Sequence, residues 1–155
     1  MKIRGGYVSN SSSSSFVIIF PKDPKSSQEL ELMLFGGPNK KYKNPWGDEV
    51  WTSKEISEYV WERMQKSGSK NNVEKAAKEF RSDGKWDTPE YEASGLKKFN
   101  EFFNVRKKKL LKLSGKPIEE VFYCLWFADE ESQLDGAIEH GNLFDKLEYR
   151  RFSHH

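Results

Sequence analysis

The chain is short of cysteine, has no long apolar run and carries no strong excess of one charge, and each shortage excludes a class of protein. It contains one Cys in 155 residues, which excludes a disulfide-built scaffold. No apolar run approaches the roughly 20 residues of a membrane-spanning helix, so no membrane partner is expected. The net charge is only +2, whereas dedicated binders of long nucleic acid usually carry a larger basic excess. The composition does not favour long nucleic acid as a partner, and does not exclude it.

Aromatic residues, in contrast, are plentiful, at 14% of the chain. Chains that remain disordered are poor in aromatic residues, and this length suits one domain. We therefore expect a single domain over residues 1–155, with a flexible segment at 1–10. Cys124 lies in the apolar run VFYCLWF, which predicts a buried core residue and not a nucleophile.

Two segments are apolar on both faces and therefore predict strands inside a sheet, with layers packed on both sides. They are residues 15–20 and 118–127, and we expect them to be neighbouring interior strands. Residues 147–154 alternate imperfectly between apolar and polar side chains, which suits an edge strand. The expected fold class is α+β, with a small sheet of about three strands covered by three to four helices that are inserted between the first and second strands.

Helix signals occupy the stretch between the first two strands. Residues 26–29 and 52–55 each have the spacing of a capping box, in which a hydroxyl and a carboxylate bind each other's backbone N–H groups. A long helix is expected over residues 89–114. The Gly-, Pro- and Asn-rich segment 36–50 predicts a loop, and residues 129–141 predict a loop with one or two helical turns.

The serine-rich start of the chain is the first of three features that could carry function, since no strong catalytic or nucleotide-binding motif is present. Gly, Ser and Asn together can shape a turn whose N–H and hydroxyl groups point at an anion, and phosphate is the usual guest. The alternatives are a polar lead-in without a ligand and a serine nucleophile. The candidate ligand-binding residues are Ser9, Asn10, Ser11, Ser12, Ser13, Ser14 and Ser15.

The second feature is the placement of all three histidines in the last 16 residues, at His140, His154 and His155. These are the candidate catalytic residues. One of them could serve as a general acid–base on a phosphate ester, or two could join a carboxylate in holding a divalent metal, although no metal ligand set is assigned. On a strand, 154 and 155 point to opposite faces, so at most one can face such a site. The alternative is surface or capping histidines without a site.

The third feature is Trp46, which lies in the 36–50 segment near Lys40, Lys41 and Lys43. Basic and aromatic side chains together can stack a base and neutralise phosphate, so Trp46 is a further candidate ligand-binding residue. The alternative is a loop anchor that packs on the core.

Residues 6–18 read GYVSNSSSSSFVI, and here the chain resembles a group of small proteins of tailed bacteriophages and some bacteria. These proteins open with (F/Y)VSNSSSSSF and continue into an apolar strand. Some are also similar near residues 139–141 (EHG) and at the end, 151–155 (RFSHH). The resemblance implies a viral or mobile-element origin and no particular activity, and it favours a joint role for the two ends. One free thiol suits a reducing compartment, so the expected location is the cytoplasm, that of the host for a phage-encoded protein.

These observations favour three functional hypotheses. The leading one is an accessory protein that binds a phosphate-bearing ligand, such as a nucleotide, through the serine-rich segment and the C-terminal histidine strand. The second is a phosphodiesterase or nuclease-like hydrolase that uses the histidines, with or without a divalent metal. The third is a protein–protein inhibitor or virion-associated protein with a host or phage protein as its partner. The sequence assigns no cofactor and leaves open whether the protein is an enzyme.

Overall fold

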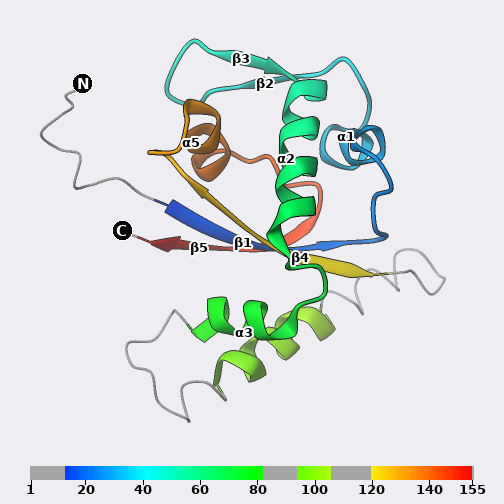
Figure 1. The fold of residues 1–155 in the computed structure, drawn as a ribbon, viewed down its shortest axis with the longest axis vertical. Coiled ribbons are helices and arrows are strands. Elements are labelled where there is room, and N and C mark those ends of the chain that lie inside the picture. The colour runs from blue at the N-terminus through cyan, green and yellow to red at the C-terminus, as the bar shows by residue number, and fades with distance from the viewer. Residues whose placement is uncertain (1–12, 82–93, 106–119, 155) are drawn as a thin grey trace, which may run out of the picture.

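The structure, a computed structural model, describes residues 13–81, 94–105 and 120–154 (Figure 1). The elements run β1 (Ser13–Phe20), α1 (Ser27–Phe35), β2 (Lys41–Lys43), β3 (Val50–Thr52), α2 (Ser53–Ser67), α3 (Val73–Arg81), a helical segment at 94–105, β4 (Val121–Ala128), α5 (Gln133–His140) and β5 (Glu148–His154). The α+β class is confirmed, and four of these helical segments lie between the first two strands of the main sheet, as expected. In the part of the chain that the structure describes, no helix is long and apolar enough to cross a membrane.

The main sheet has the strand order β4-β1-β5, and β1 is antiparallel to both neighbours. At one end of the sheet Ser13 lies opposite both Ala128 and His154, and at the other end Ile19 lies opposite Phe122 and Glu148. The interior position of β1 and the edge position of β5 are confirmed. The register therefore brings the start of β1 and the end of the chain together.

The expectation that segment 118–127 is an interior strand is wrong for its described part, because β4 is an edge strand of this sheet. Polar side chains take the place of a further strand along its outer edge. The Cys124 N–H donates to Ser69 Oγ at 2.9 Å, and Arg63 Nη1 donates to the Trp126 carbonyl at 2.7 Å. These bonds occupy backbone groups that would otherwise offer a template to another chain. An apolar strand is tolerated at the edge for this reason.

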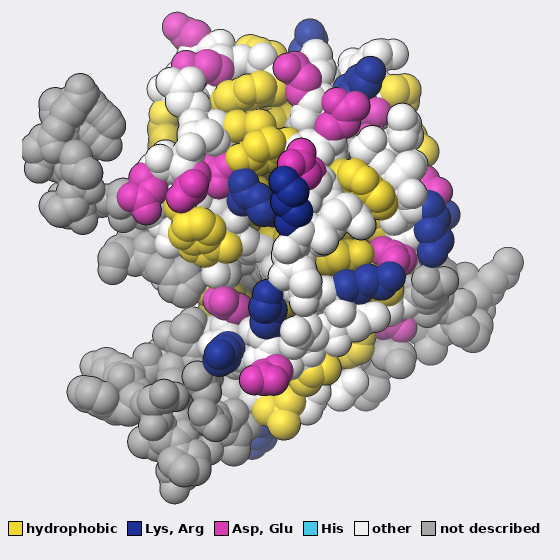
Figure 2. Space-filling model, viewed as in Figure 1, with side chains coloured by type: hydrophobic (Ala, Val, Ile, Leu, Met, Phe, Trp, Pro, Cys, Tyr) yellow, Lys and Arg dark blue, Asp and Glu magenta, His cyan; other side chains and the backbone are white. Residues whose placement is uncertain are grey.

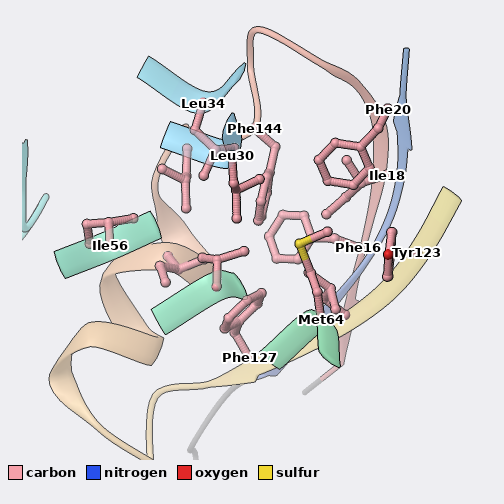
Figure 3. Packing of buried hydrophobic residues seen from close by; sticks show 14 of the residues in the cluster. Phe16, Ile18, Phe20, Leu30, Leu34, Ile56, Met64, Tyr123, Phe127 and Phe144 are labelled. Atoms are coloured by element: carbon pink, nitrogen blue, oxygen red, sulfur yellow. The ribbon is translucent and has the colours of Figure 1, made fainter. Parts of the chain in front are cut away.

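Both faces of the sheet are covered by helices (Figure 1), which explains why β1 is apolar without a break from Phe16 to Phe20. Phe16, Ile18 and Phe20 belong to the apolar cluster shared with α1, α2 and α5, which Figure 3 shows from close by. Val17 and Ile19 point the opposite way, into a second cluster with α3 and the helical segment 94–105. All five side chains are buried. Successive strand residues alternate in direction, so a strand with a helix layer on each side buries every side chain.

The two predicted capping boxes differ in the structure. At α2 the box is complete, because Thr52 Oγ1 accepts the Glu55 N–H while Glu55 Oε1 accepts the Thr52 N–H. At α1 only half of it forms. Ser26 Oγ accepts the Glu29 N–H, but Glu29 Oε1 accepts from the Lys25 N–H instead of from Ser26. Both helices still begin where the sequence predicts.

Segment 36–50 is not simply a loop, because β2 and β3 form an antiparallel hairpin within it and just beyond it. Tyr42 lies opposite Trp51 in this hairpin and is buried. Its hydroxyl donates to the Ala137 carbonyl of α5 at 2.9 Å. The strands are only three residues long, and two of the three residues of β2 are exposed lysines, so the hairpin leaves little trace in the sequence. Of the helix expected over 89–114, residues 94–105 are helical and the others lie outside the described residues.

Candidate functional site

The described part of the serine-rich segment and the C-terminal strand meet where β1 begins. Ser13 pairs with His154 across the β1–β5 ladder, and Ser14 pairs with Ser153. Ser14 Oγ also donates to Glu139 Oε2 at the end of α5, at 3.3 Å. Two sequence regions that were singled out separately are therefore neighbours in the fold, together with the end of α5.

The end of α5 places a buried carboxylate beside an imidazole. Glu139 is fully buried, and its Oε1 has no hydrogen-bond partner among the described residues. His140 Nε2 lies 3.3 Å from that oxygen. Asp129, an exposed residue just after β4, brings a carboxylate oxygen to within 4.8 Å of the ligand atoms of both residues. Two acids and one histidine thus converge on one small volume.

Trp46 lies over this histidine. Its ring centroid is 4.2 Å from that of His140, with 49° between the ring planes. The indole is nevertheless 67% exposed, which argues against the alternative of an anchor packed on the core. Asn44 Oδ1 accepts the Trp46 N–H at 3.0 Å and holds the turn between β2 and β3. Trp46 also lines a hollow of about 420 Å³ together with Lys43.

The structure separates some of the other candidates from this site. Ser15 is buried and, by the alternation of the strand, points to the face opposite that of Ser14. Ser9, Asn10, Ser11, Ser12 and His155 lie outside the described residues, as does the side chain of His154. The candidates that the structure brings together are therefore Ser14, Trp46 and His140, with the backbones of Ser13 and His154 beside them.

Arg151 is a member of this neighbourhood that the sequence did not single out. Its Nη1 donates to the backbone carbonyl of Glu139 at 3.0 Å, so β5 supports the end of α5. Arg151 lies two residues before Ser153 on β5, so both side chains are on the face of the sheet that carries Ser14. This alternation could have predicted from the sequence that Arg151 lies near the site. The guanidinium contacts the backbone of Glu139 and leaves the carboxylate without an ion pair to it.

Asp135, another acid near His140 in the sequence, belongs to a different arrangement. Its carboxylate is fully buried and is bound by Arg63, with Nη2 3.2 Å from Oδ1, and by the hydroxyl of Tyr59. It also accepts the Ala128 N–H at 3.3 Å. Burial and the hydrogen bond to Asp135 raise the pKa of Tyr59. This network ties α2, β4 and α5 together, and the guanidinium of Arg63 compensates the charge of Asp135.

The face shown in Figure 2 carries basic and acidic side chains in an interspersed pattern. A long polyanion would find no continuous basic track on this face. Comparison of the chain with family models, with curated proteins and with solved structures finds no match.

Proposed function

We propose that the protein binds a small ligand that carries a phosphate group and a flat ring, such as a nucleotide, at the end of the sheet where β1 begins. The observation that carries this proposal is the position of Trp46, whose ring is exposed yet fixed against His140. Stacking of one base on an aromatic side chain contributes about 1–3 kcal/mol. A ring that is already held in place makes this contact without a further loss of side-chain freedom.

The phosphate group would bind on the side of the hollow where Lys43 lies beside Trp46. A lysine ammonium is a common partner of phosphate. The hollow also includes Asp48, so a ligand with a single small phosphate fits this balance of charge better than a long polyanion does. Ser13 and Ser14 lie where β1 begins, beside this site, and their hydroxyl groups would add neutral donors.

The experiment is a panel of nucleoside mono-, di- and triphosphates tested by thermal shift and by calorimetric titration. Trp46→Ala is expected to weaken binding about tenfold or more, as the loss of one stacking contact implies. Trp126→Ala is the matched control, because Trp126 is also exposed, at 44%, but lies on β4 opposite Ser15. The proposal fails if no compound shifts the wild type, or if the two tryptophan variants bind equally well.

Lys43→Ala tests the contact with the phosphate separately from the contact with the ring. If Lys43 meets the phosphate, this variant loses affinity for the nucleotide but keeps its weaker affinity for the nucleoside. Equal losses for nucleotide and nucleoside would place the phosphate elsewhere. Lys41→Ala is the control, because Lys41 lies on the same strand, is also exposed and does not line the hollow.

We also propose a cytoplasmic location and a role as a phage-type accessory protein. The support is the serine-rich opening described above and the single free thiol of Cys124, which suits a reducing compartment. Fractionation of cells that express the untagged chain from its own start, followed by detection with an antibody, tests the location.

A further inference from the structure

We propose that Asp129, Glu139 and His140 hold a divalent transition-metal ion of the Zn²⁺ or Mn²⁺ class. The proposal stands on observations of its own and goes beyond the binding of a nucleotide. Each of the three residues offers one ligand atom, and these atoms lie within 4.8 Å of one another. They come from two places in the chain, the loop after β4 and the last turn of α5, which the fold brings together.

The spacing of two of these atoms already suits a shared ion. Bonds from Zn²⁺ to imidazole nitrogen or carboxylate oxygen are about 2.0–2.2 Å long, so two ligands at a tetrahedral angle lie about 3.4 Å apart. Glu139 Oε1 and His140 Nε2 are 3.3 Å apart. Asp129 is exposed and follows the end of a strand, so a small rotation of its side chain would bring it to the same ion.

The buried carboxylate is the independent observation that points to a cation. Glu139 is 0% exposed, and its Oε1 has no hydrogen-bond partner within the described part of the chain. Its other oxygen accepts the hydroxyl of Ser14. An ionised carboxylate away from water is costly unless a charge or several donors compensate for it. The nearby guanidinium of Arg151 binds the backbone carbonyl of Glu139 and not its carboxylate.

The close approach of Glu139 Oε1 and His140 Nε2 indicates which positive charge could compensate for the carboxylate. An unprotonated Nε2 and a carboxylate oxygen both present lone pairs, and their approach without a hydrogen bond is favourable only with a cation between them. A metal ion and a proton are the two candidates. Asp129 adds a second carboxylate to the same volume, which favours an ion of charge +2 over a single proton.

The donor set favours a transition metal over Mg²⁺ or Ca²⁺. Mg²⁺ and Ca²⁺ prefer oxygen ligands, whereas an imidazole suits Zn²⁺ and its first-row neighbours. Ser14 would hold the Glu139 carboxylate in place by its hydrogen bond, as outer partners of metal ligands commonly do. Three protein ligands leave at least one position for water or a phosphate oxygen. A bridge from the ion to a phosphate is the only step here that rests on the proposed function.

The test uses untagged, chelator-treated protein and the metal ions alone. Calorimetric titration is expected to show one Zn²⁺ or Mn²⁺ per chain, with Mg²⁺ and Ca²⁺ bound at least about tenfold more weakly. Glu139→Gln removes the charge but keeps the size and an acceptor for Ser14, and it is expected to lower Zn²⁺ affinity at least about tenfold. Glu131→Gln is the matched control, since Glu131 is an exposed acid of the same loop outside the cluster.

Asp129 allows a second variant, because this residue is exposed and its substitution does not disturb the buried core. Asp129→Asn is expected to fold as the wild type does, as judged by circular dichroism, and to bind Zn²⁺ more weakly. The proposal is overturned if the wild type binds no stoichiometric ion, or if Glu139→Gln and Asp129→Asn bind it as the wild type does. A proton would then be the compensating charge. Intact metal binding without any nucleotide binding would refute the proposed function and leave the metal site standing.

Discussion

Asn71 binds both backbone groups of Phe122 on the outer edge of β4. Its N–H donates to the Phe122 carbonyl at 2.8 Å, and its side-chain Oδ1 accepts the Phe122 N–H at 3.1 Å. Its φ of 54° lies in the left-handed region, where Asn is one of the few residues other than Gly that are found readily. One residue thus imitates a neighbouring strand and covers an edge that would otherwise be open.

The first prediction compares Asn71→Ala with Asn71→Gly. Both variants lose the side-chain hydrogen bond, which contributes about 1 kcal/mol. The alanine must also hold the left-handed backbone, at a further cost of about 1 kcal/mol, whereas the glycine adopts it freely. We therefore expect Asn71→Ala to lower the free energy of unfolding by about 2 kcal/mol and Asn71→Gly by about half of that. Urea unfolding measures both, and a glycine variant no more stable than the alanine variant would contradict the role of the backbone.

The second prediction concerns Gly141, where the hairpin meets α5. A Cβ atom at this position would overlap the hydroxyl of Tyr42 and would lie 2.6 Å from the Ala137 carbonyl oxygen. Gly141→Ala is therefore expected to lower the free energy of unfolding by about 2 kcal/mol or more, as overpacking usually does. Gly37→Ala is the control, because its nearest neighbour, the Lys40 side chain, lies at an ordinary 3.8 Å.

A double variant tests how much of the overlap at Gly141 is due to the Tyr42 hydroxyl and how much to the Ala137 carbonyl. Tyr42→Phe alone removes the hydrogen bond to Ala137 and is expected to cost about 1 kcal/mol. Combined with Gly141→Ala it also removes one of the two overlapping groups, so the double variant should cost less than the sum of the single ones. Additive costs in thermal or urea unfolding would show that Tyr42 does not contact residue 141.

The third prediction concerns the thiol of Cys124, which is half-buried beside an apolar cluster. Burial, and then the negative charge of Glu79, raise its pKa to about 12. Little thiolate is present at pH 8, so we expect a disulfide reagent to react at least about tenfold more slowly than in protein unfolded by urea. Equal rates in the folded and unfolded protein would refute the expectation that Cys124 is a protected core residue.

The raised pKa of Cys124 also predicts that the folded protein loses stability at alkaline pH. The folded pKa lies above the unfolded value of about 8.5, so the contribution of this thiol is fully present below that pH. It is lost as the pH rises toward 12, because the unfolded chain releases the proton first. Burial also raises the pKa of Tyr42 to about 12, so the decline is shared. In a series of urea titrations, Cys124→Ala should make the free energy of unfolding fall less steeply between about pH 8.5 and pH 10.

The strands of the main sheet could be predicted because their signals are local. The uninterrupted run from Phe16 to Phe20 requires cover on both faces, and the structure supplies a helix layer on each. The same reasoning failed for β4, because apolar side chains show that the faces are covered and say nothing of the edges. Edge cover there comes from polar side chains of α2 and of the turn after it, and no pattern within 118–127 records them.

The sequence by itself determined the class of fold, the central strand and the residues from which a site could be built, since these depend on periodicity and side-chain chemistry within short segments. Only the tertiary structure decided which candidates meet. Trp46 reaches His140 because Tyr42 docks a short hairpin on α5, and Glu139 reaches Ser14 because α5 packs against the start of β1. Contacts of this kind depend on the burial of groups distant in the chain. In the sequence, each of these residues is a polar or aromatic side chain that could have several roles. Its neighbours in the folded protein decide which role it has.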